Sequence, residues 1–218
     1  MKNKENDKNK EALEKERRRF LGMCVYEEAA YNEGARLIAG MDEAGRGPLA
    51  GPVVAACVIL PSDVFIAGLN DSKKCSPKLR DRLYDEIVEK AVALGIGKAD
   101  EKCIDDINIL NATKSAMMSA FEALKPRPDI LLIDAVRLEA LDIPQRPIIK
   151  GDSLSISIAA ASIIAKVTRD RLISEMDALY PEYGFGKHKG YGTEEHINAI
   201  KKYGICPIHR ISFTKNFV

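Results

Sequence analysis

Two adjacent acids followed by a Gly-Arg-Gly turn are the residues of this chain best suited to chemistry. Asp42 and Glu43 come directly after a short apolar run, and Gly45-Arg46-Gly47 follows them. Neighbouring carboxylates repel each other unless a cation lies between them. Glycines on both sides of an arginine let a ligand approach the backbone and bring a guanidinium to it. The stretch therefore predicts a hard divalent cation and a phosphate-bearing ligand on one surface.

Two further acids extend this prediction. Asp134 ends the apolar run Ile130–Ile133, and Asp152 precedes a long helical pattern. Each has a simpler alternative, because Asp134 could begin a turn and Asp152 could cap the helix. Carboxylates without a matching set of histidines and cysteines favour Mg²⁺ or Mn²⁺ over zinc. Such a set of acids suits phosphoryl transfer assisted by two metal ions.

A glycine-rich stretch, Gly184–Thr193, places Tyr191 next to basic side chains. An aromatic face beside basic groups suits the sugar or base of a nucleic acid. The alternative is a surface loop with the Tyr191 ring packed inward. The three histidines of the chain do not match a tetrahedral metal site, so we expect ordinary hydrogen bonds from them.

The composition is that of an ordinary globular protein. The chain has 218 residues, 46% of them hydrophobic and 30% charged, with a formal net charge of +1. This length suits one large domain, or one domain with a small appendage. The five cysteines form no C-x-x-C pair, which predicts a reduced, cytoplasmic protein. Because no apolar run approaches the roughly 18 residues of a membrane span, we expect no membrane contact.

The hydrophobic pattern predicts strands that alternate with helices, and so an α/β fold with a mixed central sheet. Strands are expected at 36–42, 53–60, 94–99, 130–133 and 147–150. Helices are expected from Pro77 to about Ala93 behind a Ser76 cap, from Asp105 or Asp106 to before Pro126, over 153–180, and over 193–202. Ligands gather at strand ends in such sheets, so the acids at 42, 43 and 134 should converge.

The N-terminal segment differs in composition from the rest. Residues Met1–Arg19 mix acids and bases, which predicts either a solvated helix or a disordered tail. Apolar residues return at helical intervals between Phe20 and Tyr31, which predicts a helix packed on the domain. The run Arg17-Arg18-Arg19 could contact nucleic acid or form a solvated face. We therefore divide the chain into an extension, residues 1–33, and a main domain, residues 34–218, with a C-terminal helical segment.

Over residues 36–213 the sequence resembles type 2 ribonuclease H (ribonuclease HII). The resemblance rests on the stretch 41–60 and on these shorter motifs: Asp71-Ser72-Lys73-Lys74, Lys150-Gly151-Asp152-Ser153, 158–170, His188-Lys189-Gly190-Tyr191-Gly192-Thr193, and Pro207-Ile208-His209-Arg210 with Ser212-Phe213. The extension lies outside it, although some members carry a similar helical leader. One residue departs from the family pattern. Ala135 stands where glycine is usual, and its methyl group disfavours a backbone conformation that glycine allows.

The resemblance implies a ribonuclease H-like fold, a mixed five-stranded sheet flanked by helices. It implies that four acids bind two Mg²⁺ or Mn²⁺ ions and carry catalysis: Asp42, Glu43, Asp134 and Asp152. It also implies that Gly45-Arg46-Gly47 reads the 2′-hydroxyl of a ribonucleotide and that Tyr191 stacks on the sugar of the following deoxynucleotide. The remaining implied site residues contact phosphate or support the site: Lys73, Asn108 and Lys166.

The implied activity is that of an endoribonuclease acting on RNA–DNA hybrids and on duplex DNA that contains ribonucleotides. It would hydrolyse the RNA strand of a hybrid and cut 5′ to a single embedded ribonucleotide, leaving 3′-hydroxyl and 5′-phosphate ends. We expect a monomer, and association with a replication clamp stays open. Two alternatives remain, a transposase- or exonuclease-type nuclease of the same fold and a catalytically decayed hybrid-binding module. The first would not need Gly45-Arg46-Gly47 or Tyr191, and a metal-dependent cleavage assay excludes or confirms the second.

Overall fold

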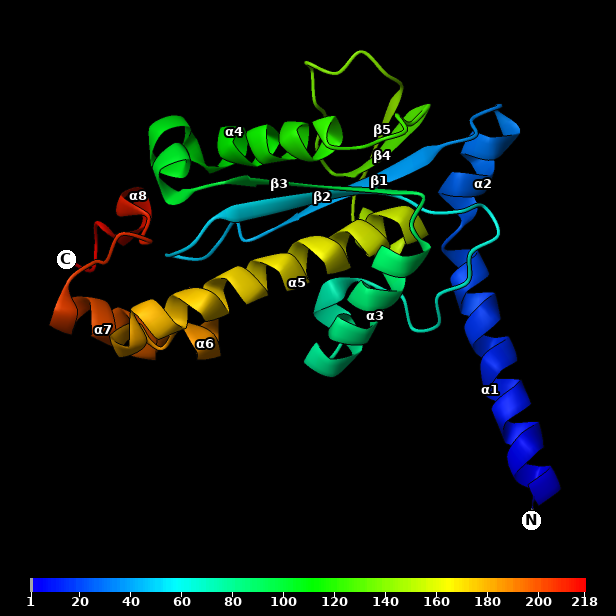
Figure 1. Ribbon diagram of the computed structural model, residues 1–218, viewed down its shortest axis with the longest axis horizontal. Helices are drawn as coiled ribbons and strands as arrows, with labels where there is room; N and C mark the ends of the chain where they lie inside the picture. The colour runs from blue at the N-terminus through cyan, green and yellow to red at the C-terminus, as the bar shows by residue number, and fades with distance from the viewer. Residues whose placement is uncertain (1) are drawn as a thin grey trace. The chain divides into compact units, whose positions relative to one another are not determined.

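The computed structural model describes the backbone of residues 2–218 and the side chains of residues 10–218 (Figure 1). Met1, with which the predicted extension 1–33 begins, lies outside the described residues. The chain forms two compact units that take up alternating segments of the sequence. The first unit comprises residues 1–42, 57–94 and 124–163, and the second comprises residues 43–56, 95–123 and 164–218.

A five-stranded mixed sheet runs through the fold in the order β3-β2-β1-β4-β5, which confirms the predicted α/β class. The strands are β1 Ile38–Ala44, β2 Val53–Ile59, β3 Ala93–Ala99, β4 Ile130–Asp134 and β5 Gln145–Ile148. β1 and β4 are parallel, with Met41 opposite Ile133. The next residue on each strand is an acid, Asp42 and Asp134, so the register brings these two side chains to the same edge.

Strand β5 was predicted two residues too late, at 147–150 instead of 145–148. The reason is Lys150, whose left-handed backbone (φ 59°) ends the extended chain before the following turn. Its neighbour β4 was predicted correctly, because Ile130–Ile133 is an uninterrupted apolar run that is buried throughout.

Helices and turns of the first unit surround its part of the sheet. They are α1 Lys2–Gly22, α2 Val25–Asn32, η1 Ser72–Lys74, α3 Pro77–Lys90, η2 Gly151–Ser153 and the start of α5 Ile156–Leu179. The predicted cap of α3 is confirmed, since the Ser76 hydroxyl accepts a hydrogen bond from the N–H of Leu79. The start of α5 packs directly on β1, where a Cβ added to Gly40 would lie 2.0 Å from the Ser157 carbonyl carbon.

The second unit holds α4 Glu101–Glu122, η3 Pro181–Tyr183, α6 Phe185–His188, α7 Glu194–Tyr203, α8 Ile211–Thr214 and the rest of α5. In Figure 1, α6 and α7 lie beside the end of α5, and their buried side chains share an apolar cluster with Ile173 of α5. The predicted Thr193 cap of α7 is confirmed by its bond from the N–H of His196.

Helix α4 begins earlier than the predicted start at Asp105 or Asp106. Asp100 caps it by accepting from the N–H of Cys103, and the helix is then kinked at Asn108 (φ 66°, ψ 163°). The Asn108 side chain accepts from the N–H groups of Leu110 and Asn111, so a second helical segment starts there. The hydrophobic periodicity predicted the helical segment after Asn108 and missed the start of the segment before it.

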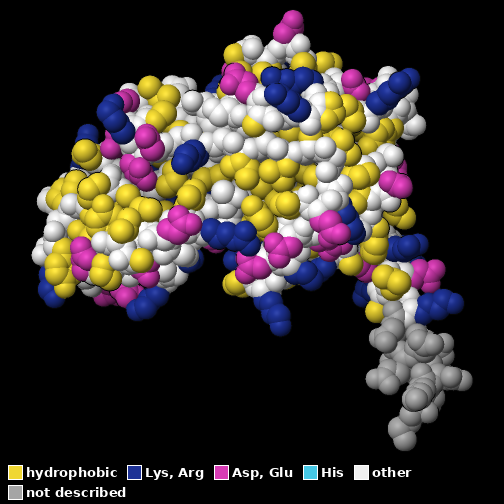
Figure 2. Space-filling model, in the orientation of Figure 1, with side chains coloured by type: hydrophobic (Ala, Val, Ile, Leu, Met, Phe, Trp, Pro, Cys, Tyr) yellow, Lys and Arg dark blue, Asp and Glu magenta, His cyan; other side chains and the backbone are white. Residues whose placement is uncertain are grey.

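Acidic and basic side chains are interspersed on the face shown in Figure 2, in keeping with the net charge of +1. Among the helices of the described chain, none has both the length and the apolar character needed to cross a bilayer.

Ala135, the residue that departs from the family pattern, has a left-handed backbone with φ 51°. Replacing it by glycine should raise the free energy of unfolding by about 1 kcal/mol, because a Cβ in this region costs about 1–2 kcal/mol and the added chain entropy of glycine offsets only part of that. Thermal denaturation of the Ala135→Gly variant measures this. Ala123→Gly is the control, since Ala123 has φ −72° and glycine should destabilise it. A lower melting temperature for Ala135→Gly would contradict the strain argument.

Candidate active site

Acidic side chains of the first unit lie on one side of Lys73, which is otherwise exposed. Its Nζ atom lies 3.6 Å from Oδ2 of Asp152. Partial burial works against the charge of Lys73, but the carboxylates of Asp152, Asp71, Asp42 and Asp134 outweigh it and raise the pKa of this lysine. Three of the four acids predicted from the sequence therefore act on one ammonium group.

The turn η2 brings Asp152 to Asp134. Oδ1 of Asp134, at the end of β4, accepts a hydrogen bond of 2.8 Å from the N–H of Gly151. Asp152 follows in the turn and is only 6% exposed. Its pKa is raised, first by burial and then by the negative charges of Asp71 and Asp134, while Lys73 lowers it.

The alternative interpretation of Asp152 as the cap of α5 does not fit this arrangement. The residue at the start of α5 that accepts from the backbone is Ser155, whose hydroxyl takes the N–H of Ile158 at 3.2 Å. Asp152 instead faces Lys73, so its carboxylate is available to the acidic cluster.

Asp71 is a member of the acidic cluster that the sequence analysis missed. It is 8% exposed, and its Oδ1 accepts from the N–H of Lys73 at the start of η1. The signal was present, since Asp71 opens the motif Asp71-Ser72-Lys73-Lys74, but only the lysine was given a role. Two features identify Asp71 as a member of the cluster: its carboxylate is buried, and it begins the motif that also contains the positively charged Lys73.

Glu43 follows Asp42 in the chain and belongs to the second unit, where its Oε1 lies 3.5 Å from Nη1 of Arg46. Within the part of the chain that the structure describes, no three His, Cys, Asp or Glu side chains lie close enough as they stand to hold a metal ion. The acids of the first unit nevertheless fit a hard divalent cation. All their donors are carboxylate oxygens, and both the burial and the neighbouring negative charges that raise the pKa of Asp152 are what such a cation would offset.

Two arginines that are fully buried hold the Gly-Arg-Gly turn in the second unit. Arg210 donates to the carbonyl of Gly45 at 2.6 Å, to that of Arg46 at 2.8 Å and, from two nitrogens, to that of Gly51. Burial, reinforced by the nearby charge of Arg169, lowers the pKa of Arg210 to about 9. The sequence analysis quoted Arg210 within a family motif but assigned it no role.

Arg169 completes this clamp from helix α5. It donates to the carbonyls of Ala50 and Pro52, on the far side of the turn, and to that of Lys189. Gly45 has φ 100°, and a Cβ there would lie 2.0 Å from Nε of Arg169. Glycine is therefore required at position 45 both for its backbone conformation and for the space that the arginine occupies.

Tyr191 lies beside the turn with its ring outward. It is 44% exposed, so the alternative of an inward-packed ring does not hold. A Cβ added to Gly47 would lie 3.9 Å from its Cε1 atom. Lys166 reaches the ring with its Nζ 5.9 Å from the centroid and pairs with Asp170 at 2.8 Å. Gly47, Tyr191 and Lys166, all predicted site residues, thus lie together in the second unit.

A pair of buried histidines holds the backbone of Tyr191. Nδ1 of His196 lies 2.9 Å from the Tyr191 carbonyl and must donate to it, so Nε2 of His196 accepts from Nε2 of His209 at 3.0 Å. Nδ1 of His209 then accepts from the N–H of Cys206. Both imidazoles are neutral in this chain of bonds. The expectation of ordinary hydrogen-bonding histidines is confirmed, but their link to Tyr191 was not predicted.

Asn108 is the remaining site residue predicted from the sequence. It lies at the kink of α4 and lines a depression of about 410 Å³ with Ile104, Asp105 and Phe213. Its positive φ is uncommon for a residue other than glycine and is a form of strain often found at functional positions.

The sequence profile that describes ribonuclease HII matches residues 39–216. The chain belongs to the ribonuclease HII family. It is 66% identical over 212 residues to ribonuclease HII of Acetivibrio thermocellus, covering 97% of this chain and 83% of that protein. As a ribonuclease HII it is an enzyme, a hydrolase with ribonuclease H endonuclease activity, which confirms the resemblance predicted from the motifs.

Solved structures of ribonucleases H share the fold. Ribonuclease HII of Archaeoglobus fulgidus, solved in complex with PCNA, superposes with a TM-score of 0.65 at 26% identity, over 80% of this chain and 94% of that one. The ribonuclease HIII named Bst-RNase HIII, solved in complex with Mn²⁺, gives 0.59 at 25% identity, over 81% of this chain and 65% of that one.

The histidine pair makes stability depend on pH. Burial, followed by the charge of His196, lowers the pKa of His209 to about 4, and burial lowers that of His196 as well. An unfolded histidine titrates near 6.5, so between these values the unfolded chain binds more protons than the folded one. Stability should be complete above about pH 6.5 and fall by up to about 1.4 kcal/mol per unit and per histidine as the pH drops toward 4.

Urea denaturation across pH 4–8 measures this, with His209→Gln as the comparison. The difference in stability between the wild type and the variant should be constant above pH 6.5 and shrink below it. Parallel stability curves over the whole range would contradict the assignment of a neutral, buried His209.

Proposed function

We propose that this enzyme hydrolyses the RNA strand of RNA–DNA hybrids and cuts duplex DNA on the 5′ side of single embedded ribonucleotides, leaving 3′-hydroxyl and 5′-phosphate ends. The observation that carries the proposal is the convergence of Asp42, Asp134 and Asp152 on Lys73. A cluster of acids with an adjacent ammonium group suits the recognition of a phosphodiester together with divalent cations. Glu43, next to Asp42 in the chain, is the fourth acid of the proposed set.

Two Mg²⁺ or Mn²⁺ ions are the cofactors we propose for this site. When bound by Asp42, Glu43, Asp134 and Asp152, such ions activate a water molecule and stabilise charge on the attacking and leaving oxygens. The hydrogen bond from Gly151 to Asp134 orients that carboxylate, and Lys73 offers its charge to the phosphate. Asp134 stands on a strand end and Asp152 on a short turn, so their backbone is held in place while the side chains close on the cations.

Recognition of the ribonucleotide is assigned to the Gly45-Arg46-Gly47 turn. Its carbonyls are fixed by Arg210, so the turn is a rigid backbone surface that can hydrogen-bond a 2′-hydroxyl, the group that distinguishes RNA from DNA. The Arg46 side chain is about half exposed, with 46% of its surface accessible, and suits contact with a phosphate. The outward ring of Tyr191 is proposed to stack on the following sugar.

Lys166 and Asn108 are supporting residues in this proposal. Lys166 lies against the Tyr191 ring and pairs with Asp170, so it steadies the ring and adds positive charge beside it. Asn108 fixes the kink of α4 through its bonds to Leu110 and Asn111. We propose that the chain acts as a monomer. A replication clamp is a candidate partner, because the relative from Archaeoglobus fulgidus was solved in complex with PCNA.

Asp134→Asn should abolish most of the activity and leave the fold intact. The amide can still accept the N–H of Gly151, but it removes a negative charge from the proposed cation site, and we expect a loss of at least about 10²–10³-fold in turnover. The measurement is cleavage of a labelled hybrid in Mg²⁺ and in Mn²⁺, with melting temperature as the check on folding. Asp85→Asn, an exposed acid of α3, is the matched control and should keep full activity. Wild-type rates for Asp134→Asn would overturn the assignment of the acids.

Tyr191→Ala should affect single ribonucleotides more than long hybrids. Loss of a stacking contact costs about 1–3 kcal/mol, so cleavage at one embedded ribonucleotide should fall roughly ten- to a hundredfold. A continuous RNA strand presents a ribose at the following position, and the loss there should be smaller. Tyr191→Phe keeps the ring and should retain most activity, and Tyr203→Ala removes a similarly exposed tyrosine as a control. Equal losses on both substrates would mean that Tyr191 supports the site without reading the junction.

A further inference from the structure

The N-terminal helices make polar contacts with the segments that carry the acids. Oε1 of Glu16 accepts from the N–H of Gly68 at 2.7 Å, and Nη2 of Arg19 donates to the carbonyl of Leu69 at 2.8 Å. Arg19 and Glu16 also pair with each other through two hydrogen bonds. Of the two alternatives for this segment, the solvated helix is confirmed, since α1 is helical and its described side chains before Arg19 are mostly exposed. Its last turns, however, are tied to the chain just before Asp71.

Helix α2 is tied to the start of α5 through Glu27, which is 3% exposed. Oε1 of Glu27 accepts from the Ser155 hydroxyl at 2.5 Å and from the N–H of Ser157 at 3.0 Å. Met23, between α1 and α2, accepts from the N–H of Ile156 at 3.2 Å. The first turn of α5 thus obtains hydrogen-bond acceptors from a part of the chain that lies outside the ribonuclease HII profile.

An unbroken series of hydrogen bonds leads from Glu27 to the acidic cluster. Glu27 holds Ser155, the N–H of Ser155 donates to the carbonyl of Gly151 at 2.9 Å, and the N–H of Gly151 donates to Asp134. Asp152 lies between Gly151 and Ser155 in the chain. Moving Ser155 would therefore disturb two of the proposed metal-binding acids together.

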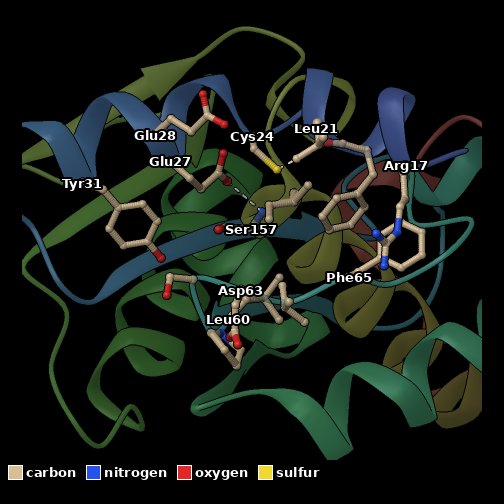
Figure 3. Close-up of a pocket in the computed structure, with 15 residues that line it drawn as sticks. Arg17, Leu21, Cys24, Glu27, Glu28, Tyr31, Leu60, Asp63, Phe65 and Ser157 are labelled. Carbon is tan, nitrogen blue, oxygen red and sulfur yellow. Dashed lines mark hydrogen bonds between the residues drawn. The ribbon is translucent and has the colours of Figure 1, made fainter. Parts of the chain in front are cut away.

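Apolar packing alone does not fix this contact. A cavity of about 310 Å³ lies between side chains of the N-terminal extension (the leader, residues 1–33), the segment 60–65 and the start of α5. Glu27 and Ser157 both line it. Figure 3 shows Glu27 above Ser157, joined to it by a dashed line, with Tyr31 and Phe65 on either side. Oε2 of Glu27 is buried without a hydrogen-bond partner in the described chain, a cost that an apolar residue would avoid. A buried acid in an incompletely packed contact fits a role in positioning better than one in packing.

We propose that Glu27 is a positioning residue of this enzyme, which holds Asp134 and Asp152 in their metal-binding arrangement through Ser155 and Gly151. In this proposal helix α2 of the leader helps to position the side chains of the active site. The inference rests on the proposed function only in so far as these acids bind the cations. The inference predicts that a substitution at Glu27 alters the Mg²⁺ concentration that cleavage requires, although Glu27 itself does not bind the cations.

Glu27→Leu and Glu27→Gln test the proposal, with Glu28→Leu as the control because Glu28 is its exposed neighbour. Leucine removes the acceptor and keeps the bulk, whereas glutamine keeps the acceptor. We expect Glu27→Leu to raise the Mg²⁺ concentration for half-maximal cleavage about tenfold, the scale of losing an outer partner of a metal ligand. Glu27→Gln and Glu28→Leu should stay within about twofold of the wild type, since in both a side-chain oxygen at position 27 still accepts from Ser155 and Ser157.

A second measurement needs no catalysis. Amide hydrogen exchange at 151–157 in the protein without added metal should be about tenfold faster in Glu27→Leu than in Glu28→Leu, since the hydrogen-bonded series is cut. Ser155→Ala removes the hydroxyl that donates to Glu27 and so breaks the same first link from the other side. It should reproduce both effects, and it serves if Glu27→Leu does not fold. Unchanged exchange and an unchanged Mg²⁺ requirement in the folded variants would overturn the proposal. If the wild type itself fails to cleave, the proposed function falls, and the exchange experiment still decides whether Glu27 positions the turn.

Discussion

The Gly-Arg-Gly turn of this enzyme depends on two positive charges that are buried away from water. The guanidinium groups of Arg169 and Arg210 are completely buried, and their donors satisfy carbonyl oxygens of the turn after β1. A buried cation is costly, and the lowered pKa of Arg210 reflects that cost. Its hydrogen bonds to several carbonyls offset the desolvation and fix the turn more firmly than neutral donors would.

The acidic cluster presents the opposite arrangement. Asp71 and Asp134 repel Asp152, and the ammonium group of Lys73 offsets that repulsion only in part. The carboxylate of Asp134 is also restrained by its bond from the backbone of Gly151. Acids that repel one another do not hold themselves together, so their arrangement depends on the backbone that carries them, a strand end and a short turn, and on the helices packed behind it.

The sequence predicted the parts of this protein whose signal is local. The apolar run Ile130–Ile133, the Ser76-Pro77 start of α3 and the Thr193 cap of α7 are short patterns with one structural meaning. Residue types and spacing singled out the four acids, the Gly-Arg-Gly turn and Tyr191, and motif resemblance gave them the roles that remain predictions. Boundaries failed where φ is positive at a residue other than glycine, as at Lys150 and Asn108, because this conformation is uncommon even for asparagine and the hydrophobic pattern does not mark it.

What the sequence could not reveal are contacts between distant segments. Arg210 lies more than 150 residues from Gly51, whose carbonyl it holds, and Glu27 lies 128 residues from Ser155. A buried arginine and an exposed one look alike in a sequence, and so do a solvated glutamate and one that caps a distant helix. The motif that begins with Asp71 was a signal in the sequence, but only the fold shows that Asp71 lies near Asp152.

The histidines have a consequence for metal selectivity. A neutral imidazole has one nitrogen able to bind a metal, and in each of the three histidines that nitrogen already accepts a hydrogen bond, from Gly190 in His188, from His209 in His196 and from Cys206 in His209. Zinc or nickel could coordinate there only by breaking these bonds. The imidazoles that support the loop of Tyr191 are therefore poor ligands for borderline ions as long as these hydrogen bonds hold.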